Sequence, residues 1–273
     1  MSLKEELSSV MGQDLNTLYK RNLLKEILQN YALNFIYNSR YNKLIFTGGT
    51  CLRKVYGLNR LSEDLDFDYE RGFNLTGFDS DITGYFVSQG YQNITYRWSK
   101  LKNTLFIKFP LSQIDKKNKE VLFLRIDVTN VYCDIYETEV NLINASNFSF
   151  LVNSYDISTL FANKIIAFLE RSFFKGKEQK FQSKGRDVYD LFWLLNLSEN
   201  ASFKIKPNKK RLEAVLNIKE DVIEKLIKER LIKVDKKFVY DDIKPLLESN
   251  DLLDSFIENY QDFINKKVDL VVG

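Results

Sequence analysis

The chain has 273 residues, 44% of them hydrophobic and 14% aromatic, so it can bury one large core or two moderate ones, and we expect it to fold. Its formal net charge is +3, and it contains no histidine, which excludes Ser-His-Asp and Cys-His catalysis. Cys51 and Cys133 lack the spacing of a zinc site or a disulfide framework, which suits a reduced cytoplasmic setting. Neither a signal peptide nor a membrane-spanning apolar stretch is apparent, so we expect a cytoplasmic protein with no membrane partner.

The first long pattern is an amphipathic helix over residues 14–38. Its apolar residues recur at helical spacing, and Asp14 is a suitable N-cap. We expect this helix to pack against the core and not to carry a site.

Residues 44–68 predict a strand, a glycine turn, a short helix and a second strand. An apolar run stops at Gly48-Gly49-Thr50, and acidic and apolar residues then alternate at 64–68. Because strand side chains alternate with a period of two, the two apolar residues face one way and the three aspartates face the other.

The glycine turn and the aspartates suit two parts of one substrate. Carboxylates two residues apart on a strand lie roughly 6–7 Å apart, so Asp64 and Asp66 could share divalent cations, and their oxygen ligands suit Mg²⁺. Glycines let the backbone approach a ligand closely, and the helix N-terminus after them attracts phosphate. Taken alone, each motif is most often structural, the glycine pair as a turn and D-x-D as a solvated strand face.

Together, in the order GGT…R-x-S-x-D-x-D, these motifs resemble the AbiEii/AbiGii-type nucleotidyltransferase toxins, a branch of the DNA polymerase β-like nucleotidyltransferase superfamily. From chemistry alone Ser62 is better explained as holding a turn, but the resemblance implies that it belongs to the catalytic motif. We expect Asp64 and Asp66 to bind the metal. The residues that we expect to contact the substrate here are Gly48, Gly49, Thr50, Arg60 and Ser62, and Arg53 or Lys54 could also reach phosphate.

The next elements are a helix near 79–89 and strands at 91–98, 104–109 and 121–131. On the last strand, Asp127 and Arg125 face away from the apolar side. Nucleotidyl transfer calls for a third carboxylate on a neighbouring strand, to complete a metal site or to accept a proton. The alternative for Asp127 is a structural salt bridge with Arg125, but the resemblance favours the metal-binding and catalytic role.

Strand-like patterns fade near residue 150. We therefore expect an α/β nucleotidyltransferase domain over 1–150 and a helical domain over 151–273 that completes the active cleft. The fold class is α+β, with a polymerase β-like mixed sheet and flanking helices before the helical part. Charge is divided as well, because residues 60–81 hold seven acidic residues against two arginines, whereas 160–211 hold 12 Lys and Arg against five Asp and Glu. This division suits a Mg-nucleotide and a polyanionic acceptor, although a lysine-rich solvated surface explains the basic half as well.

A helix at 156–172, a basic loop and a second helix carry the pattern K-x-x-A-x-x-x-R followed by G-R-D-x-Y-D-L, which is similar to later motifs of the same toxin family. The resemblance implies that Lys164 holds the triphosphate and that Asp187 takes part in catalysis. We also expect Arg186 to contact the substrate, and Asp190 is the weaker candidate. Taken alone, Lys164 would be a surface lysine and Asp187 a helix-capping residue.

Beyond residue 197 the sequence predicts charged amphipathic helices at 208–232 and 241–265. Their basic patches, which include Lys209, Lys210 and Arg211, could contact RNA, but a solvated helical face explains them better.

We therefore expect attack of an acceptor hydroxyl on the α-phosphate of an NTP, with Mg²⁺ and loss of pyrophosphate, and with Asp127 or Asp187 assisting the hydroxyl. The resemblance implies a toxin of a toxin–antitoxin or phage-defence (abortive infection) system that modifies the tRNA 3′ end. It also implies a separately encoded, DNA-binding antitoxin that need not contact the toxin. Two alternatives remain, modification of a protein hydroxyl and a non-catalytic module that binds a nucleotide or a partner.

Overall fold

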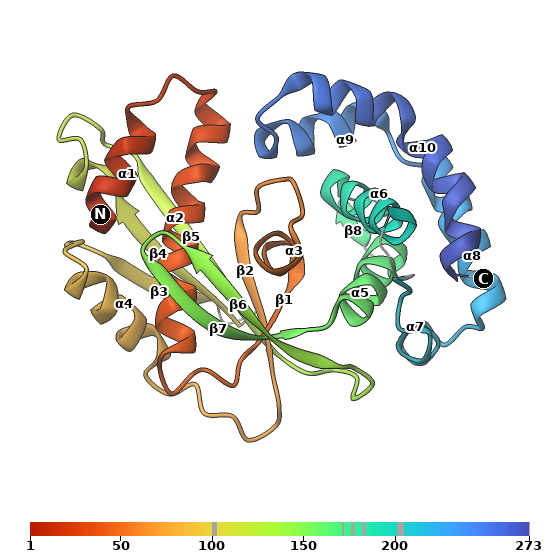
Figure 1. The fold of residues 1–273 in the computed structure, drawn as a ribbon, viewed down its shortest axis with the longest axis horizontal. Helices are drawn as coiled ribbons and strands as arrows, with labels where there is room; N and C mark the ends of the chain where they lie inside the picture. Colours follow the sequence, from red (N-terminus) through yellow and green to blue (C-terminus); the bar gives the residue numbers. More distant parts are fainter. Residues whose placement is uncertain (100–102, 171, 176–177, 182–183, 201–204, 273) are drawn as a thin grey trace. The chain divides into compact units, whose positions relative to one another are not determined.

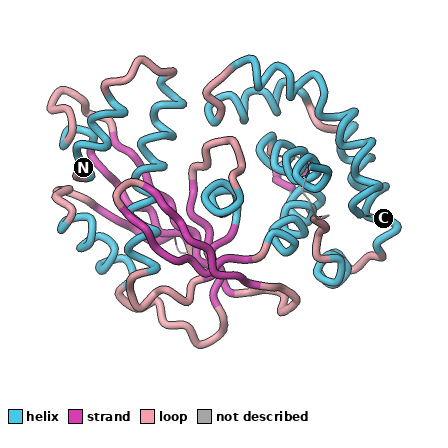
Figure 2. Tube along the Cα trace, in the orientation of Figure 1, coloured by secondary structure: helices cyan, strands magenta, loops and turns pink. Residues whose placement is uncertain are grey.

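The structure is a computed structural model that describes residues 1–273 except for 100–102, 171, 176–177, 182–183, 201–204 and 273 (Figures 1 and 2). The chain folds into two compact units. One comprises Met1–Tyr132 and Thr138–Tyr155, and the other comprises Cys133–Glu137 and Asp156–Gly273. Residue 150, where we expected the boundary, lies inside strand β7 (Phe148–Tyr155), so the first unit extends to the end of that strand.

The first unit is built on a seven-stranded mixed sheet in the order β3-β4-β5-β2-β1-β7-β6. In this sheet β2 pairs with β5 and β1 with β7 in parallel, and the other neighbours pair antiparallel. The sheet and its helices confirm the predicted α+β class. The strands are β1 (Ile45–Thr47), β2 (Asp64–Tyr69), β3 (Thr95–Ser99), β4 (Thr104–Pro110), β5 (Val121–Asn130), β6 (Thr138–Ala145) and β7.

The helices of the first unit are α1 (Leu3–Met11), α2 (Thr17–Tyr37), α3 (Gly48–Tyr56), α4 (Phe78–Ser88) and the short 3-10 helix η1 (Leu111–Gln113). The sequence did not predict α1. The N-cap of α2 is Asn16 and not Asp14, because the Asn16 side chain accepts hydrogen bonds from the backbone N–H groups of Leu18 (3.0 Å) and Tyr19 (3.4 Å). Asp14 lies too far before the first turn to take this role.

Alternation along β2 and β5 gives the sheet a dry face and a polar face. Leu65 and Phe67 on β2, and Ile126 and Val128 on β5, are at most 1% exposed. The ring of Tyr37, on α2, packs against Phe67 on the dry face, with the centroids 6.4 Å apart. The aspartates of β2 therefore project from the polar face, as the predicted alternation requires.

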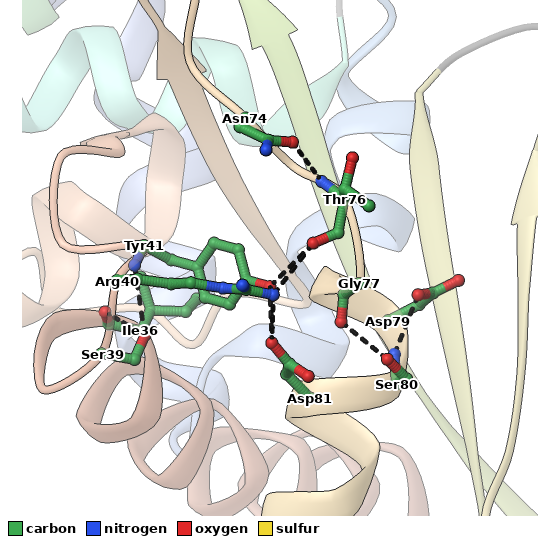
Figure 3. Close-up of polar contacts among 10 residues, drawn as sticks. All are labelled: Ile36, Ser39, Arg40, Tyr41, Asn74, Thr76, Gly77, Asp79, Ser80 and Asp81. Carbon is green, nitrogen blue, oxygen red and sulfur yellow. Dashed lines mark hydrogen bonds and ion pairs between the residues drawn. The ribbon is translucent and has the colours of Figure 1, made fainter.

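A polar cluster around Asp81, in the first turn of α4, fixes the loop that follows β2 (Figure 3). Arg40 donates hydrogen bonds to Asp81 Oδ2 (2.7 Å) and to the carbonyl of Thr76 (3.0 Å), and Tyr41 donates to Asp81 Oδ2 (2.7 Å). Burial and the bond to Asp81 together raise the pKa of Tyr41, so its hydroxyl stays a donor. The cluster ties the segment after α2 to the start of α4.

The second unit is mainly helical. Its helices are α5 (Ile157–Glu170), α6 (Gly185–Asn200), α7 (Lys209–Leu216), α8 (Glu220–Ile232), α9 (Lys236–Ile243), the short 3-10 helix η2 (Lys244–Leu246) and α10 (Asn250–Val272). Where we expected a basic loop before α6, β8 (Ser172–Lys175) and β9 (Glu178–Phe181) pair antiparallel. In the part of the chain that the structure describes, no helix combines the length and the apolar composition needed to span a bilayer.

Arg211, which the sequence places in a basic patch, is 0% exposed. Its Nε donates to Asn163 Oδ1 on α5 (2.7 Å), and its Nη1 donates to the carbonyls of Cys133 (3.0 Å) and Ile135 (2.9 Å). Arg211 therefore joins α5, α7 and the segment 133–137 inside the second unit. The expectation of a solvated or RNA-binding side chain is wrong at this position.

Replacing Arg211 with alanine leaves three partly buried acceptors without this donor. We expect the change to lower the free energy of unfolding of the second unit by about 3 kcal/mol or more. Chemical denaturation followed by far-UV circular dichroism measures the loss. Lys210→Ala, at the exposed neighbouring position, is the matched control and should cost less than about 0.5 kcal/mol. Equal stability of the two variants would contradict the bridging role.

Candidate active site

The glycine turn between β1 and α3 lies directly against Asp66 of β2. Gly48 has φ +77°, which side chains rarely tolerate, and a Cβ at this position would lie 2.2 Å from Asp66 Oδ2. Both the backbone conformation and the available space therefore require glycine. The turn and the D-x-D strand, which the sequence predicts as one site, are in contact.

Gly49 is packed against Arg60 and Ser62. A Cβ on Gly49 would lie 2.8 Å from Arg60 Nη2 and 3.2 Å from Ser62 Oγ. Arg60 is only 1% exposed, and its Nη1 donates to the carbonyl of Leu61 (2.8 Å). Its guanidinium thus packs against the turn at Gly49, and the substrate contact that we expected from Arg60 stays a prediction. Ser62, 7% exposed, lies beside the same turn.

Thr50 joins the start of α3 to the start of β2. Its side chain is 0% exposed, and its hydroxyl donates to the backbone carbonyl of Asp64. A phosphate contact from Thr50 would therefore come from its backbone N–H. The first N–H groups of a helix have no partner within the helix and attract anions.

Asp66 and Asp127 are direct neighbours on the parallel strands β2 and β5. The same register places Asp64 opposite Arg125, and residues in register on adjacent strands point to the same face. The side chains of Asp64 and Asp127 remain 26% and 18% exposed. The three carboxylates that the sequence predicts as metal ligands thus share one face of one strand pair.

Arg125 lies between two of these carboxylates. Its Nη1 is 3.4 Å from Asp64 Oδ2, and its Nη2 donates to Asp127 Oδ2 at 2.5 Å. Burial lowers the pKa of Arg125. The negative charges of Asp64, Asp127 and Asp66 have the larger effect, so the pKa of Arg125 is raised above its ordinary value. The salt bridge that we considered as the alternative for Asp127 is present, and Asp127 also accepts a hydrogen bond from the Thr104 hydroxyl.

Across the described residues, no group of three or more His, Cys, Asp or Glu side chains is arranged to hold a metal ion. The guanidinium of Arg125 brings a positive charge among the carboxylates in this arrangement. The donor set itself fits a hard divalent cation, because Asp64, Asp66 and Asp127 offer only oxygen ligands and carry more negative charge than one arginine balances.

The third aspartate of the alternating strand has a different environment. Asp68 is 7% exposed and accepts hydrogen bonds from the hydroxyls of Thr129 on β5 (2.6 Å) and Tyr155 on β7 (2.7 Å). It therefore fastens β2 to two other strands.

In the second unit, Lys164 on α5 pairs with Asp190 on α6, with Nζ 2.6 Å from Oδ2. The Lys164 side chain is 12% exposed and that of Asp190 is 0% exposed. Asp187, in the first turn of α6, is 2% exposed. Burial lowers the pKa of Arg230 on α8, and the negative charge of Asp187 opposes that effect, so these two groups interact as well. Our sequence analysis missed Arg230, because nothing in the chain near Asp187 points to α8.

Gly185 and Arg186 join the start of α6 to α9. A Cβ on Gly185 would lie 2.8 Å from Val239 Cα, so only glycine allows this approach. The backbone N–H of Arg186 donates to Asp242 Oδ2 (3.0 Å), and its Nε is 3.8 Å from the same oxygen. The structure thus brings Lys164, Asp187 and Asp190 together within the second unit, and it pairs Arg186 with Asp242.

Arg53 and Lys54, the further candidates for a phosphate contact, form a partly buried ionic cluster with Glu26 of α2. Lys54 Nζ is 2.8 Å from Glu26 Oε1, and Arg53 Nη2 is 3.1 Å from Oε2. Burial lowers the pKa of Lys54 despite this pairing. Glu26, Arg53 and Lys54 line a cavity of about 310 Å³. Another cavity, of about 460 Å³, is lined by Arg40, Lys43, Glu70 and Arg71. The glycine turn, Ser62 and the aspartates of β2 and β5 line neither cavity.

A family model described as the nucleotidyl transferase AbiEii toxin of type IV toxin–antitoxin systems matches residues 37–269. This span contains the motifs of both units. The chain belongs to the AbiEii nucleotidyltransferase toxin family. The protein is therefore a nucleotidyltransferase that uses an NTP, and type IV toxin–antitoxin membership implies an antitoxin partner. Nucleotidyltransferases in general use divalent metal ions.

Solved structures support the fold of this AbiEii member. Similar structures include MenT4, the nucleotidyltransferase toxin Rv2826c from Mycobacterium tuberculosis H37Rv, with TM-score 0.53, 13% identity and coverage of 97% of this chain and 89% of that one. JHP933 from Helicobacter pylori gives TM-score 0.50 and 19% identity, covering 94% of this chain and 96% of that one. No curated protein sequence matches the chain.

The contact between Gly48 and Asp66 gives a matched pair of variants. Gly57, at the other end of α3, has φ +82°, and a Cβ added there would meet no atom within 4 Å, so Gly57→Ala carries only the backbone strain. We expect each alanine to cost about 1–2 kcal/mol of stability, but only Gly48→Ala to lower nucleotidyl transfer by about 100-fold or more, because its Cβ displaces Asp66. Thermal unfolding and a transfer assay on both variants measure this, and equal activity would contradict the assigned contact.

Proposed function

We propose that this AbiEii member transfers a nucleoside monophosphate from an NTP to the 3′ end of tRNA, using Mg²⁺. The observation that supports the proposal is the in-register pair Asp66 and Asp127, with the Gly48 turn against Asp66. Two carboxylates held together on neighbouring strands provide the ligands that phosphoryl transfer by metal ions requires. The adjacent glycine turn opens a helix whose N-terminus favours phosphate.

In this proposal, Asp64, Asp66 and Asp127 hold Mg²⁺. Bound Mg²⁺ would supply positive charge to the α-phosphate and to the leaving pyrophosphate. Gly48, Gly49 and the backbone of Thr50 position the phosphates, with Ser62 beside them and Arg60 packed against the turn. Asp127 or Asp187 accepts the proton of the attacking hydroxyl. Most of the rate enhancement then comes from positioning and charge neutralisation.

Lys164 neutralises the triphosphate in this mechanism. Its Nζ lies 2.6 Å from Oδ2 of Asp190, whose side chain is fully buried, so the ion pair fixes where the ammonium lies on α5. Arg186, held by Asp242, has a smaller role as a substrate contact. The biological setting that we propose is growth arrest in a toxin–antitoxin or phage-defence system, in the cytoplasm, with an antitoxin that is separately encoded.

Incorporation of each α-³²P-labelled NTP into total bacterial RNA and into total protein, with Mg²⁺, tests the function. We expect label in tRNA-sized RNA with the wild-type chain, and at least about 100-fold less with Asp64→Ala, because the mutant loses a metal ligand. Label in protein alone would replace the tRNA acceptor by a protein hydroxyl. No label anywhere, with NTP binding intact, would favour a binding module.

Arg125 gives a test of the metal site that does not depend on turnover. In Arg125→Gln the carboxylates of Asp64 and Asp127 lose their counter-charge, so we expect a lower thermal midpoint in EDTA than for the wild type. Mg²⁺ at about ten times its Kd should then restore about 1.4 kcal/mol, or roughly 3–5 °C.

Two controls make this result specific. Lys108→Gln removes a positive charge from the same face of the sheet without touching the carboxylates, and its midpoint should not respond to Mg²⁺ more than the wild type does. Adding Asp66→Asn to Arg125→Gln should abolish the gain. A midpoint of Arg125→Gln that is insensitive to Mg²⁺ would contradict the metal assignment.

A further inference from the structure

Three rows of side chains cross the polar face of the sheet in register from the edge strand β3, and two of them end at the carboxylates of β2. The central row contains Arg97, Phe106, Arg125 and Asp64. The row on one side contains Thr95, Lys108 and Phe123, and the row on the other contains Ser99, Thr104, Asp127 and Asp66. Because in-register neighbours point to the same face, the outer members share the face of the catalytic carboxylates.

Four of these residues form what we call the aromatic–cationic platform: Arg97, Phe106, Lys108 and Phe123. Phe123 is 40% exposed, Arg97 and Lys108 are exposed, and Phe106 is half-buried. The Arg97 guanidinium lies over the Phe106 ring, 5.1 Å from its centroid. The platform residues contribute little to the core, which lies on the opposite face, where Leu105, Ile107, Leu122 and Leu124 are 0% exposed.

The platform has the composition that single-stranded nucleic acid requires. Aromatic rings and arginine planes accept stacked bases of any sequence, and cations neutralise the phosphates of the backbone. The platform contains no carboxylate, which favours a polyanion over a basic or neutral polypeptide. Its outermost strand is about 14 Å from Asp64, three strand spacings across the sheet, so one ligand can cover the platform and still reach the carboxylates.

We propose that the aromatic–cationic platform binds the single-stranded 3′ end of the acceptor RNA and directs its terminal hydroxyl toward Asp66 and Asp127. Phe123 stacks on a base, Arg97 and Phe106 together hold a second base or its phosphate, and Lys108 contacts the backbone. This inference rests on the proposed function, whose acceptor it places on a surface. Arg125 is not part of the platform, because it is engaged by Asp64 and Asp127.

Fluorescence anisotropy with the full chain and a labelled short single-stranded oligoribonucleotide, without NTP, tests the platform. We expect Phe123→Ala to weaken binding about tenfold or more, as for loss of one stacked base. Arg97→Gln and Lys108→Gln should each lower the slope of log affinity against log salt by about 0.7, the value for one phosphate contact on a single strand. The Kd for NTP should stay unchanged in all three variants.

The chain offers matched controls on the same sheet. Tyr96 is 43% exposed but belongs to the opposite face of β3, so Tyr96→Ala removes an exposed aromatic ring without touching the platform. Lys119→Gln removes an exposed positive charge from the turn before β5. Both should bind the oligoribonucleotide as the wild type does, and thermal midpoints verify that every variant is folded.

Wild-type affinity in Phe123→Ala and Arg97→Gln, or an equal loss in Tyr96→Ala, would overturn the platform. Its failure is distinguishable from failure of the proposed function. Suppose that label enters RNA with the wild type, disappears in Asp64→Ala, and the platform variants bind RNA as the wild type does. This combination would support the proposed function and refute only the platform. Platform-dependent RNA binding without any transfer to RNA would refute the function and keep the binding surface.

Discussion

Parallel pairing of β2 with β5 determines where the charges of the first unit lie. The register is held by the buried side of the same strands, where Leu65 faces Ile126 and Phe67 faces Val128. A slip of one residue would turn these apolar side chains to water and bury Asp64 and Asp66 instead, so the hydrophobic core fixes the register strongly. The position of Asp66 beside Asp127 is therefore a consequence of burial on the other side of the sheet.

Bringing three carboxylates together costs free energy, since like charges repel and each loses water. The protein offsets the cost with a charged and a neutral donor, the Arg125 guanidinium and the Thr104 hydroxyl. Asp68 shows another outcome of the same pattern, because it accepts hydrogen bonds from hydroxyls of β5 and β7 inside the fold. Asp64 and Asp127 differ from Asp68 in their exposure, because their side chains are 26% and 18% exposed and Asp68 is 7% exposed.

Local patterns in the sequence were sufficient for the elements of the site. The period of two predicted β2 and β5, the glycine pair predicted the turn, and the family motifs selected Asp64, Asp66 and Lys164. Burial of charged residues could not be predicted, because it depends on partners far along the chain. Arg60 packs against Gly49, and Arg211 binds Asn163 and the segment 133–137, so both side chains are buried. In the sequence both arginines stand in polar stretches, which would indicate exposed side chains. The cap at Asn16 was missed for a local reason, because both Asp14 and Asn16 are good capping residues.

The key cations already have protein partners, Arg125 with Asp64 and Asp127, and Lys164 with Asp190. If Asp64 and Asp127 hold the metal as we propose, a phosphate alone would have to draw Arg125 from these carboxylates and leave them uncompensated. A metal ion alone would leave the displaced guanidinium without a counter-charge. A metal–NTP complex brings both signs of charge together, so each displaced protein group gains a new partner. In the proposed mechanism, the paired ground state would therefore favour the complete metal–NTP substrate over either of its components, which is a form of specificity that unpaired charges would not give.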